Sequence, residues 1–184
     1  MKHKHALVIG GTGMLSDVSA WLNKKGYIVT VIGRRNETYH KLLKKVPKPK
    51  RMKSVLVDYH NTAALTETLM ERMKKDGTFD VIVAWVHRSA PEAIPAVLNL
   101  VAANRKESFD FYHVKSSTSY RNKTKIEVPS TCNLYEIYLG FKIFNNHSRW
   151  LTNKEISEGV IGSIHHKRKM TIVGELEPWE KRPH

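Results

Sequence analysis

Two patterns of apolar residues alternate along the chain. Short continuous apolar runs, such as Ala6 to Ile9 and Ile28 to Ile32, are typical of strands buried on both faces of a sheet. The stretch from Leu15 to Lys25 has apolar residues at helical spacing and is followed by Gly26, a common helix terminator. This alternation predicts an α/β fold of three layers, with helices on both sides of a doubly wound, mostly parallel sheet.

The same patterns continue to the end of the chain. Further strands are expected at 54–57, 79–86, 109–114 and 170–174, and further helices at 37–45, 62–75, 91–103 and 152–165. No helical pattern stands out between 116 and 133. Residues 134–144 fit both helical spacing and strict alternation, but their aromatic and β-branched side chains, with Gly140 in mid-run, favour a strand.

Composition sets the scale and the compartment. The chain has 184 residues, of which 41% are hydrophobic, and this suits one domain over residues 1–184. No apolar run approaches the ~20 residues of a membrane helix, and the N-terminus leads into a strand rather than a signal peptide. The single cysteine, Cys132, cannot form an intrachain disulfide. Together these features predict a cytoplasmic protein.

The formal net charge of +14 would attract polyanions, including nucleic acids. The densest basic segment, 41–53, is not interleaved with aromatic residues as in platforms that bind single strands, so a solvated basic surface is favoured over nucleic-acid binding. His165 and His166 are adjacent, and on a helix adjacent side chains point to different faces. No metal site is predicted.

A glycine-rich turn joins the first strand to the first helix. Its residues are Gly10, Gly11, Thr12, Gly13, Met14, Leu15 and Ser16. Glycines let backbone N–H groups approach a pyrophosphate at the positive end of a helix, although they also occur in purely structural turns. The position between strand and helix favours dinucleotide binding through Gly10, Thr12, Gly13, Met14 and Leu15. Met14 also fits a packing role.

This turn resembles the Gly-x-x-Gly-x-x-Gly turn of the short-chain dehydrogenase/reductase superfamily. Gly10 and Gly13 match the pattern, and Ser16 stands where the third glycine usually does, which indicates a divergent member. The resemblance covers residues 5–119 clearly and the part from about 120 to 184 only loosely. It implies a Rossmann-type domain that binds NAD or NADP.

The end of the second predicted strand bears on the choice of cofactor. In this fold an acidic residue there binds the ribose 2′-hydroxyl of NAD, whereas arginine pairs with the 2′-phosphate of NADP. The chain has Arg34 and Arg35 and no acidic residue, so NADP(H) is favoured over NAD(H), the alternative being that the arginines face solvent. Asp58, after the third strand, matches the position that faces adenine in the superfamily, or else serves as a turn or helix-cap residue.

Candidates for chemistry follow the fourth and fifth strands. Where the family commonly has Asn-Asn-Ala-Gly, this chain has Ala84-Trp85-Val86-His87, which makes Trp85 a cofactor contact and places His87 near the nicotinamide. His87 is otherwise an ordinary loop histidine. The resemblance puts the catalytic serine at Ser117, in a Ser/Thr run that would also suit any polar turn.

The Tyr-x-x-x-Lys motif of the family has one literal match, at Tyr138 and Lys142. In the family the tyrosine donates a proton and the lysine lowers its pKa, which requires a helix. On the favoured strand the two Cα atoms would lie ~13 Å apart, so we expect that they are not the catalytic pair.

The sequence therefore predicts an NADP(H)-binding oxidoreductase acting on a small carbonyl or alcohol. An alternative is a regulatory protein that senses NADP(H) without catalysis, and nucleic-acid binding is a less favoured third possibility. The expected partners are a small-molecule substrate and possibly a second copy of the chain, with no membrane.

Overall fold

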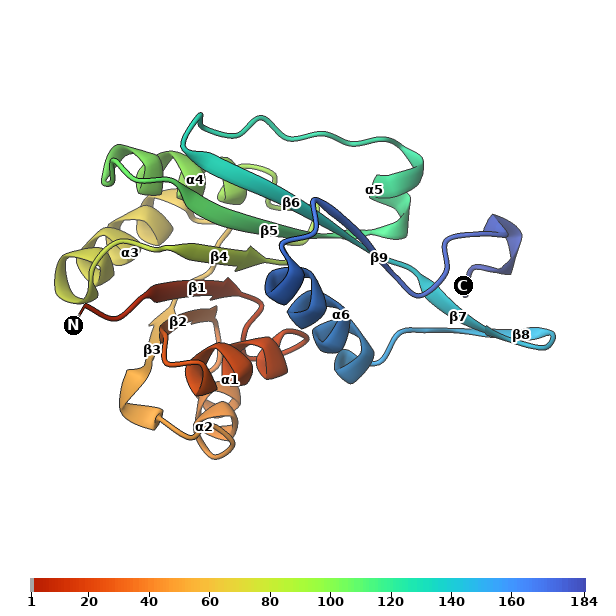
Figure 1. Cartoon of the computed structure of the whole chain (residues 1–184), viewed down its shortest axis with the longest axis horizontal. Helices are drawn as coiled ribbons and strands as arrows, with labels where there is room; N and C mark the ends of the chain where they lie inside the picture. The colour runs from red at the N-terminus through yellow and green to blue at the C-terminus, as the bar shows by residue number, and fades with distance from the viewer. Residues whose placement is uncertain (1) are drawn as a thin grey trace.

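A computed structural model describes residues 2–184, and its largest feature is a seven-stranded parallel sheet in the order β3-β2-β1-β4-β5-β6-β9 (Figure 1). Its strands are β1 His5–Ile9, β2 Ile28–Gly33, β3 Met52–Leu56, β4 Val81–Ala84, β5 Phe109–Ser116, β6 Cys132–Leu139 and β9 Met170–Val173. β1 pairs with β2 on one side and β4 on the other, so the strand order reverses there. The predicted doubly wound sheet is confirmed.

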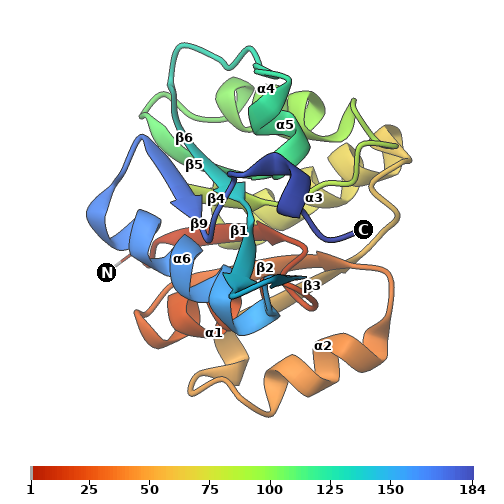
Figure 2. The same ribbon diagram turned by 90° about the vertical axis from the view of Figure 1, so that its right-hand side faces the viewer.

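Helices cover both faces of this sheet (Figure 2). One face packs against α1 Ser16–Lys24, α2 Asn36–Leu43 and α6 Asn153–His166, and the other against α3 Thr62–Asp76 and α4 Ala93–Ala103. Alternate residues of each strand point to opposite faces, so the sheet divides the core into two apolar clusters. None of the helices formed by residues 2–184 combines the length and apolar character of a membrane span.

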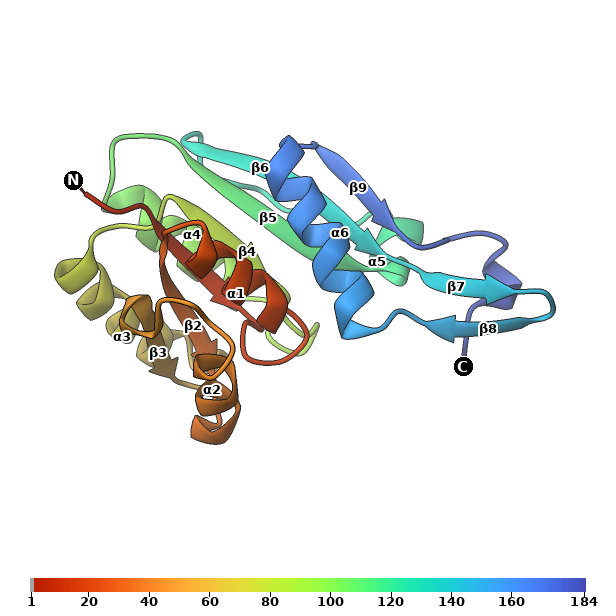
Figure 3. The ribbon, with the colours of Figure 1, turned by 60° about the horizontal axis from the view of Figure 1, so that its bottom comes forward.

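Residues 134–144 are extended, as the sequence favoured, but they do not form one strand. β6 ends at Leu139, and β7 Phe141–Phe144 pairs with β8 His147–Trp150 in an antiparallel hairpin that projects beyond the sheet (Figure 3). Gly140 separates the two because a Cβ there would overlap the backbone of Glu175. The amides of Phe141 and Glu175 each donate to the carbonyl of the other, at 2.9 and 2.8 Å, and this fixes the C-terminal segment against the strand break.

The connection from β5 to β6 corrects one prediction. The sequence indicated no helix between 116 and 133, yet a short helix, α5 Ser117–Arg121, follows β5 directly. Its N-cap is Ser116, whose Oγ accepts a hydrogen bond from the amide of Ser119. Five residues are too few for a periodic apolar pattern, which is why the helix was missed. The remaining short elements are the 3₁₀ turns η1 Pro49–Arg51 and η2 Trp179–Lys181.

Candidate functional site

The glycine-rich turn lies at the carboxyl end of β1, where the strand order reverses. Gly10 has φ +88°, a conformation that other residues rarely adopt. A Cβ at Gly11 would lie 2.6 Å from Ser19 Oγ and 2.9 Å from the side chains of Val8 and Val31. The turn therefore packs directly on the sheet and on α1, as a dinucleotide-binding turn requires.

The outer side of the turn is open. A Cβ at Gly13 would meet no protein atom within 4 Å, and no side chain of residues 2–184 caps the N-terminus of α1. Backbone N–H groups of a first helical turn need an acceptor, and a phosphate is a suitable one. Lys45 lies at this end too, where its Nζ donates to Ser16 Oγ at 2.8 Å and forms an ion pair with Asp17 Oδ1 at 2.7 Å, so the two charges of the pair offset each other. The residues present thus fit a pyrophosphate.

The two arginines and Asp58 lie at neighbouring strand ends. Arg34 and Arg35 are exposed and follow β2, whose last residue is paired with the end of β3. Asp58 accepts hydrogen bonds from the amide and ring of His60, and these, with a contribution from Arg34, lower the pKa of its carboxyl. Asn61, not Asp58, caps α3. Asp58 is therefore an exposed turn residue close to Arg34.

Trp85 and His87 follow β4 on the other side of the turn. The Trp85 amide donates to the carbonyl of Ile9 at 3.1 Å, and a Cβ at Gly10 would lie 3.6 Å from the Trp85 carbonyl oxygen. His87 Nδ1 lies 2.8 Å from Ser89 Oγ. Both residues face a pocket next to the turn, so the structure brings these two predicted residues together.

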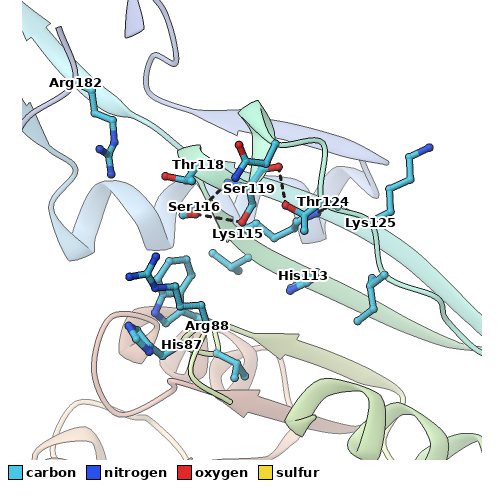
Figure 4. A pocket seen from close by; sticks show the side chains of 15 residues that line it. His87, Arg88, His113, Lys115, Ser116, Thr118, Ser119, Thr124, Lys125 and Arg182 are labelled. Atoms are coloured by element: carbon cyan, nitrogen blue, oxygen red, sulfur yellow. Dashed lines mark hydrogen bonds between the residues drawn. The ribbon is translucent and has the colours of Figure 1, made fainter. Parts of the chain in front are cut away.

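This pocket has a volume of about 510 Å³ and lies beyond the carboxyl ends of β4 and β5 (Figure 4). Its walls come from the loop after β4, the last residues of β5, α5, the loop that follows α5, and the C-terminal segment. The lining residues are Trp85, Val86, His87, Arg88, His113, Val114, Lys115, Ser116, Thr118, Ser119, Asn122, Thr124, Lys125, Ile126 and Arg182. A volume of this size suits a small-molecule ligand.

Ser117 lies outside this lining. It is only 2% exposed, whereas its neighbours Ser116, Thr118 and Ser119 line the pocket. The hydroxyls of Ser116 and Ser119 lie 3.2 Å apart and hydrogen bond to each other. The Ser/Thr run thus lies at the expected edge of the sheet, but the residues that face the pocket are those on either side of Ser117. A role for Ser117 itself stays a prediction.

Tyr138 and Lys142 lie on different strands, β6 and β7, and neither lines the pocket. The Tyr138 hydroxyl instead donates to Glu136 Oε2 at 2.9 Å and accepts from Lys115 Nζ at 3.3 Å. Burial and the Glu136 carboxylate raise the pKa of Tyr138. The lysine beside this tyrosine is therefore Lys115, from the adjacent strand.

Lys115 is buried, and its ammonium group connects three parts of the structure. Nζ donates to the Thr124 carbonyl at 2.6 Å, to Glu136 Oε2 at 2.9 Å and to Tyr138. Burial acts to raise the pKa of Glu136, but the hydrogen bonds from Lys115 and Tyr138 outweigh it and bring the pKa below its usual value. The ion pair thus fixes both the floor of the pocket and the loop after α5.

His113 precedes this cluster on the same face of β5. Burial, with the nearby Lys115 charge, lowers its pKa to about 4, so the imidazole is neutral at pH 7. Its Nδ1 is buried and has no hydrogen-bond partner among residues 2–184. Sequence reasoning missed His113 and Lys115, although polar residues at alternate positions of an apolar strand were a usable signal. Nothing in the sequence pointed to Arg88 or Arg182.

Solved structures with the same arrangement of strands and helices include short-chain dehydrogenases/reductases. One from Serratia marcescens is 11% identical, with a TM-score of 0.70 over 94% of this chain and 96% of that one. Another, named as a glucose/ribitol dehydrogenase, from Brucella melitensis, is 13% identical, with a TM-score of 0.68 over 94% and 96%. This chain shares the Rossmann-type fold of these structures.

A D-mannonate oxidoreductase structure from Haemophilus influenza with bound NAD has this fold too, with 11% identity and a TM-score of 0.68 over 95% of this chain and 94% of that one. No protein-family model matches the sequence, and no curated protein matches it significantly. Identities this low establish the fold alone, so the activity has to be argued from the site. Between β5 and β6 this chain has the five-residue α5 and a loop.

The ion pair of Lys115 and Glu136 predicts that removing one partner destabilises the fold more than removing both. Glu136→Leu should lower the free energy of unfolding by about 3 kcal/mol, because it leaves a buried ammonium without its carboxylate. Adding Lys115→Met should recover most of the loss, since no buried charge then remains. Urea unfolding at pH 7 measures both variants.

A surface pair provides the control for this measurement. Lys154 and Glu158 are 3.9 Å apart and their side chains are 80% and 65% exposed, so Glu158→Gln should cost less than about 1 kcal/mol. A double variant as unstable as Glu136→Leu alone would show that Lys115 was not the cause.

Proposed function

We propose that the chain binds NADP(H) in preference to NAD(H) at the edge formed by the glycine-rich turn, and that it is an oxidoreductase acting on a small carbonyl or alcohol. The observation that supports this best is the open space outside Gly13 at the uncapped N-terminus of α1. This opening lies at the point where the strand order reverses, which is where open α/β sheets bind ligands.

The proposed contacts divide along the cofactor. Backbone groups of residues 10–15 would hold the pyrophosphate, and Arg34 with Arg35 would pair with the 2′-phosphate. Asp58 and Trp85 would lie beside the adenine and nicotinamide ends. A nicotinamide bound there would provide hydride-transfer chemistry, and the pocket beyond Trp85 would hold the reacting molecule.

Polar groups of the pocket would orient that molecule. His87, Ser116 and Ser119 line it with hydrogen-bonding groups, and His113 offers a neutral imidazole. Such groups can hydrogen bond to a carbonyl or hydroxyl oxygen and hold its proton in place. The cytoplasmic location and a homo-oligomer remain part of this proposal.

A second candidate is an NADP(H) sensor without catalysis. It is favoured by one observation: no tyrosine lines the pocket within residues 2–184, and the Tyr138 hydroxyl already binds Glu136. A sensor needs the nucleotide contacts but no proton donor. Turnover with any small carbonyl would exclude it.

Cofactor preference is the first test. NADPH should bind roughly ten to a hundred times more tightly than NADH, because a charge-assisted contact to phosphate contributes ~1.5–3 kcal/mol. Arg34→Ala with Arg35→Ala should remove that preference, as measured by calorimetric titration. The control is Lys41→Ala with Lys44→Ala, which removes the same charge from exposed positions in and just after nearby α2. Equal affinities in the wild type would refute the preference.

The turn provides a second test, in which binding separates from folding. Gly13→Val should abolish NADPH binding and leave thermal unfolding unchanged, because the added side chain meets no protein atom and occupies the proposed place of the pyrophosphate. Gly11→Ala should instead lower stability by about 1–3 kcal/mol, because its Cβ would overlap Ser19, Val8 and Val31. Full NADPH binding by Gly13→Val would place the nucleotide elsewhere.

Catalytic roles are tested by NADPH oxidation with a panel of small aldehydes, ketones and quinones. Tyr138→Phe should leave turnover almost unchanged, since its hydroxyl binds Glu136 outside the pocket. If the imidazole of His87 acts as the general acid or base, His87→Ala should reduce turnover about a hundredfold. Ser117→Ala and Ser116→Ala compare the predicted serine with its neighbour in the pocket. A large loss confined to Tyr138→Phe would contradict this assignment.

A further inference from the structure

The pocket has a marked imbalance of charge. Its lining includes Arg88, Lys115, Lys125 and Arg182, but no aspartate or glutamate. Lys115 is neutralised by Glu136, and Figure 4 shows the Lys125 side chain turned away from the pocket. Arg88 and Arg182 remain, and neither forms an ion pair with any carboxylate of residues 2–184. The pocket therefore presents two uncompensated guanidinium groups.

Arg182 is held in position despite lying near the end of the chain. Its guanidinium carbon lies 4.8 Å from the ring centre of Trp150 and 5.2 Å from that of Trp179. Stacking on aromatic rings orients a guanidinium without using its hydrogen-bond donors. Nε of Arg182 is buried and lacks a partner within the described chain. The side chain is thus ordered, desolvated in part and still able to donate.

Figure 4 shows how the two arginines are arranged. Arg182 enters from the C-terminal segment, and Arg88 comes from the loop after β4, together with His87. The hydroxyls of Ser116, Thr118 and Ser119 lie on the wall between β5 and α5. Donors from three separate segments therefore face one space, which is the arrangement expected around an anionic group.

We propose that this pocket binds small molecules that carry a carboxylate or phosphate group, held by Arg88 and Arg182. The charged group would pair with the guanidiniums, while the rest of the molecule would lie toward Trp85 and His113. The volume of about 510 Å³ limits the ligand to a small molecule. As a substrate class this rests on the proposed function, but binding of the anion itself requires no nucleotide.

Uncharged polar groups of the lining extend the same inference. The hydroxyls of Ser116, Thr118 and Ser119 can each donate to or accept from a hydroxyl or carbonyl group of the ligand. The pocket thus suits an oxo-acid, a hydroxy-acid or the corresponding phosphate ester.

The test uses the full chain without nucleotide. Butanoate, propyl phosphate and the uncharged butanamide are titrated at fixed ionic strength and followed through the NMR signals of the His113 ring. At least one of the two anions should bind roughly ten times more tightly than butanamide, because hydrogen bonds to charged groups are the stronger ones. The anion with the higher affinity distinguishes a carboxylate site from a phosphate site.

Variants locate the effect. Arg182→Gln and Arg88→Gln should each weaken binding of the preferred anion about tenfold. Two exposed lysines outside the lining provide controls: Lys181, next to Arg182, and Lys123, between the lining residues Asn122 and Thr124. Lys181→Gln and Lys123→Gln each remove one positive charge and should have little effect. Arg88 lies in an exposed loop, so its variant remains informative even if Arg182→Gln disturbs the C-terminal segment.

Equal binding of the anions and butanamide would overturn the proposal. So would equal losses in Lys181→Gln and Arg182→Gln, since these would indicate general charge attraction. Competition between butanoate and NADPH would also overturn it, by assigning the arginines to the nucleotide. If NADPH fails to bind while an anion still depends on Arg88 and Arg182, the proposed function fails and this inference stands.

Discussion

The close contact between the glycine-rich turn and the sheet is the constraint on which the site depends. β1 is hydrogen bonded to β2 and β4, and the chain leaves its carboxyl end through a turn with no room for a side chain at Gly11. Because the backbone lies so near Val8 and Val31, the N-terminus of α1 opens over the edge of the sheet. All seven strands run parallel, so the segments after β2, β4 and β5 reach the same edge.

A second constraint comes from the short connection between β5 and β6. α5 has only five residues, and the polar side chains of His113, Lys115, Glu136 and Tyr138 lie on neighbouring positions of the two strands. A buried ammonium group without a carboxylate partner is costly. Since Lys115 also binds the Thr124 carbonyl, the pair that neutralises the sheet face orders the loop that closes the pocket.

The sequence predicted the order of strands and helices well because each long element has its own apolar period. It also predicted the extended conformation of residues 134–144, but not the break at Gly140, because that break depends on contact with Glu175, 35 positions later. The pairing of Lys115 with Tyr138 was equally inaccessible, since it arises from the register of β5 with β6. A linear motif suggested Lys142 instead. Local patterns thus predicted elements, whereas contacts between elements decided the candidate site.

The effect of a positive charge on ligand binding depends on where its side chain lies. A net charge of +14 attracts every anion, but salt screens exposed lysines such as those in 41–53. Arg182 differs because Trp150 and Trp179 hold its guanidinium beside a pocket and its Nε is buried. Selective binding of a small anion requires donors that are oriented before the ligand arrives. An arginine in such surroundings therefore says more about the ligand than the remaining surface charge does.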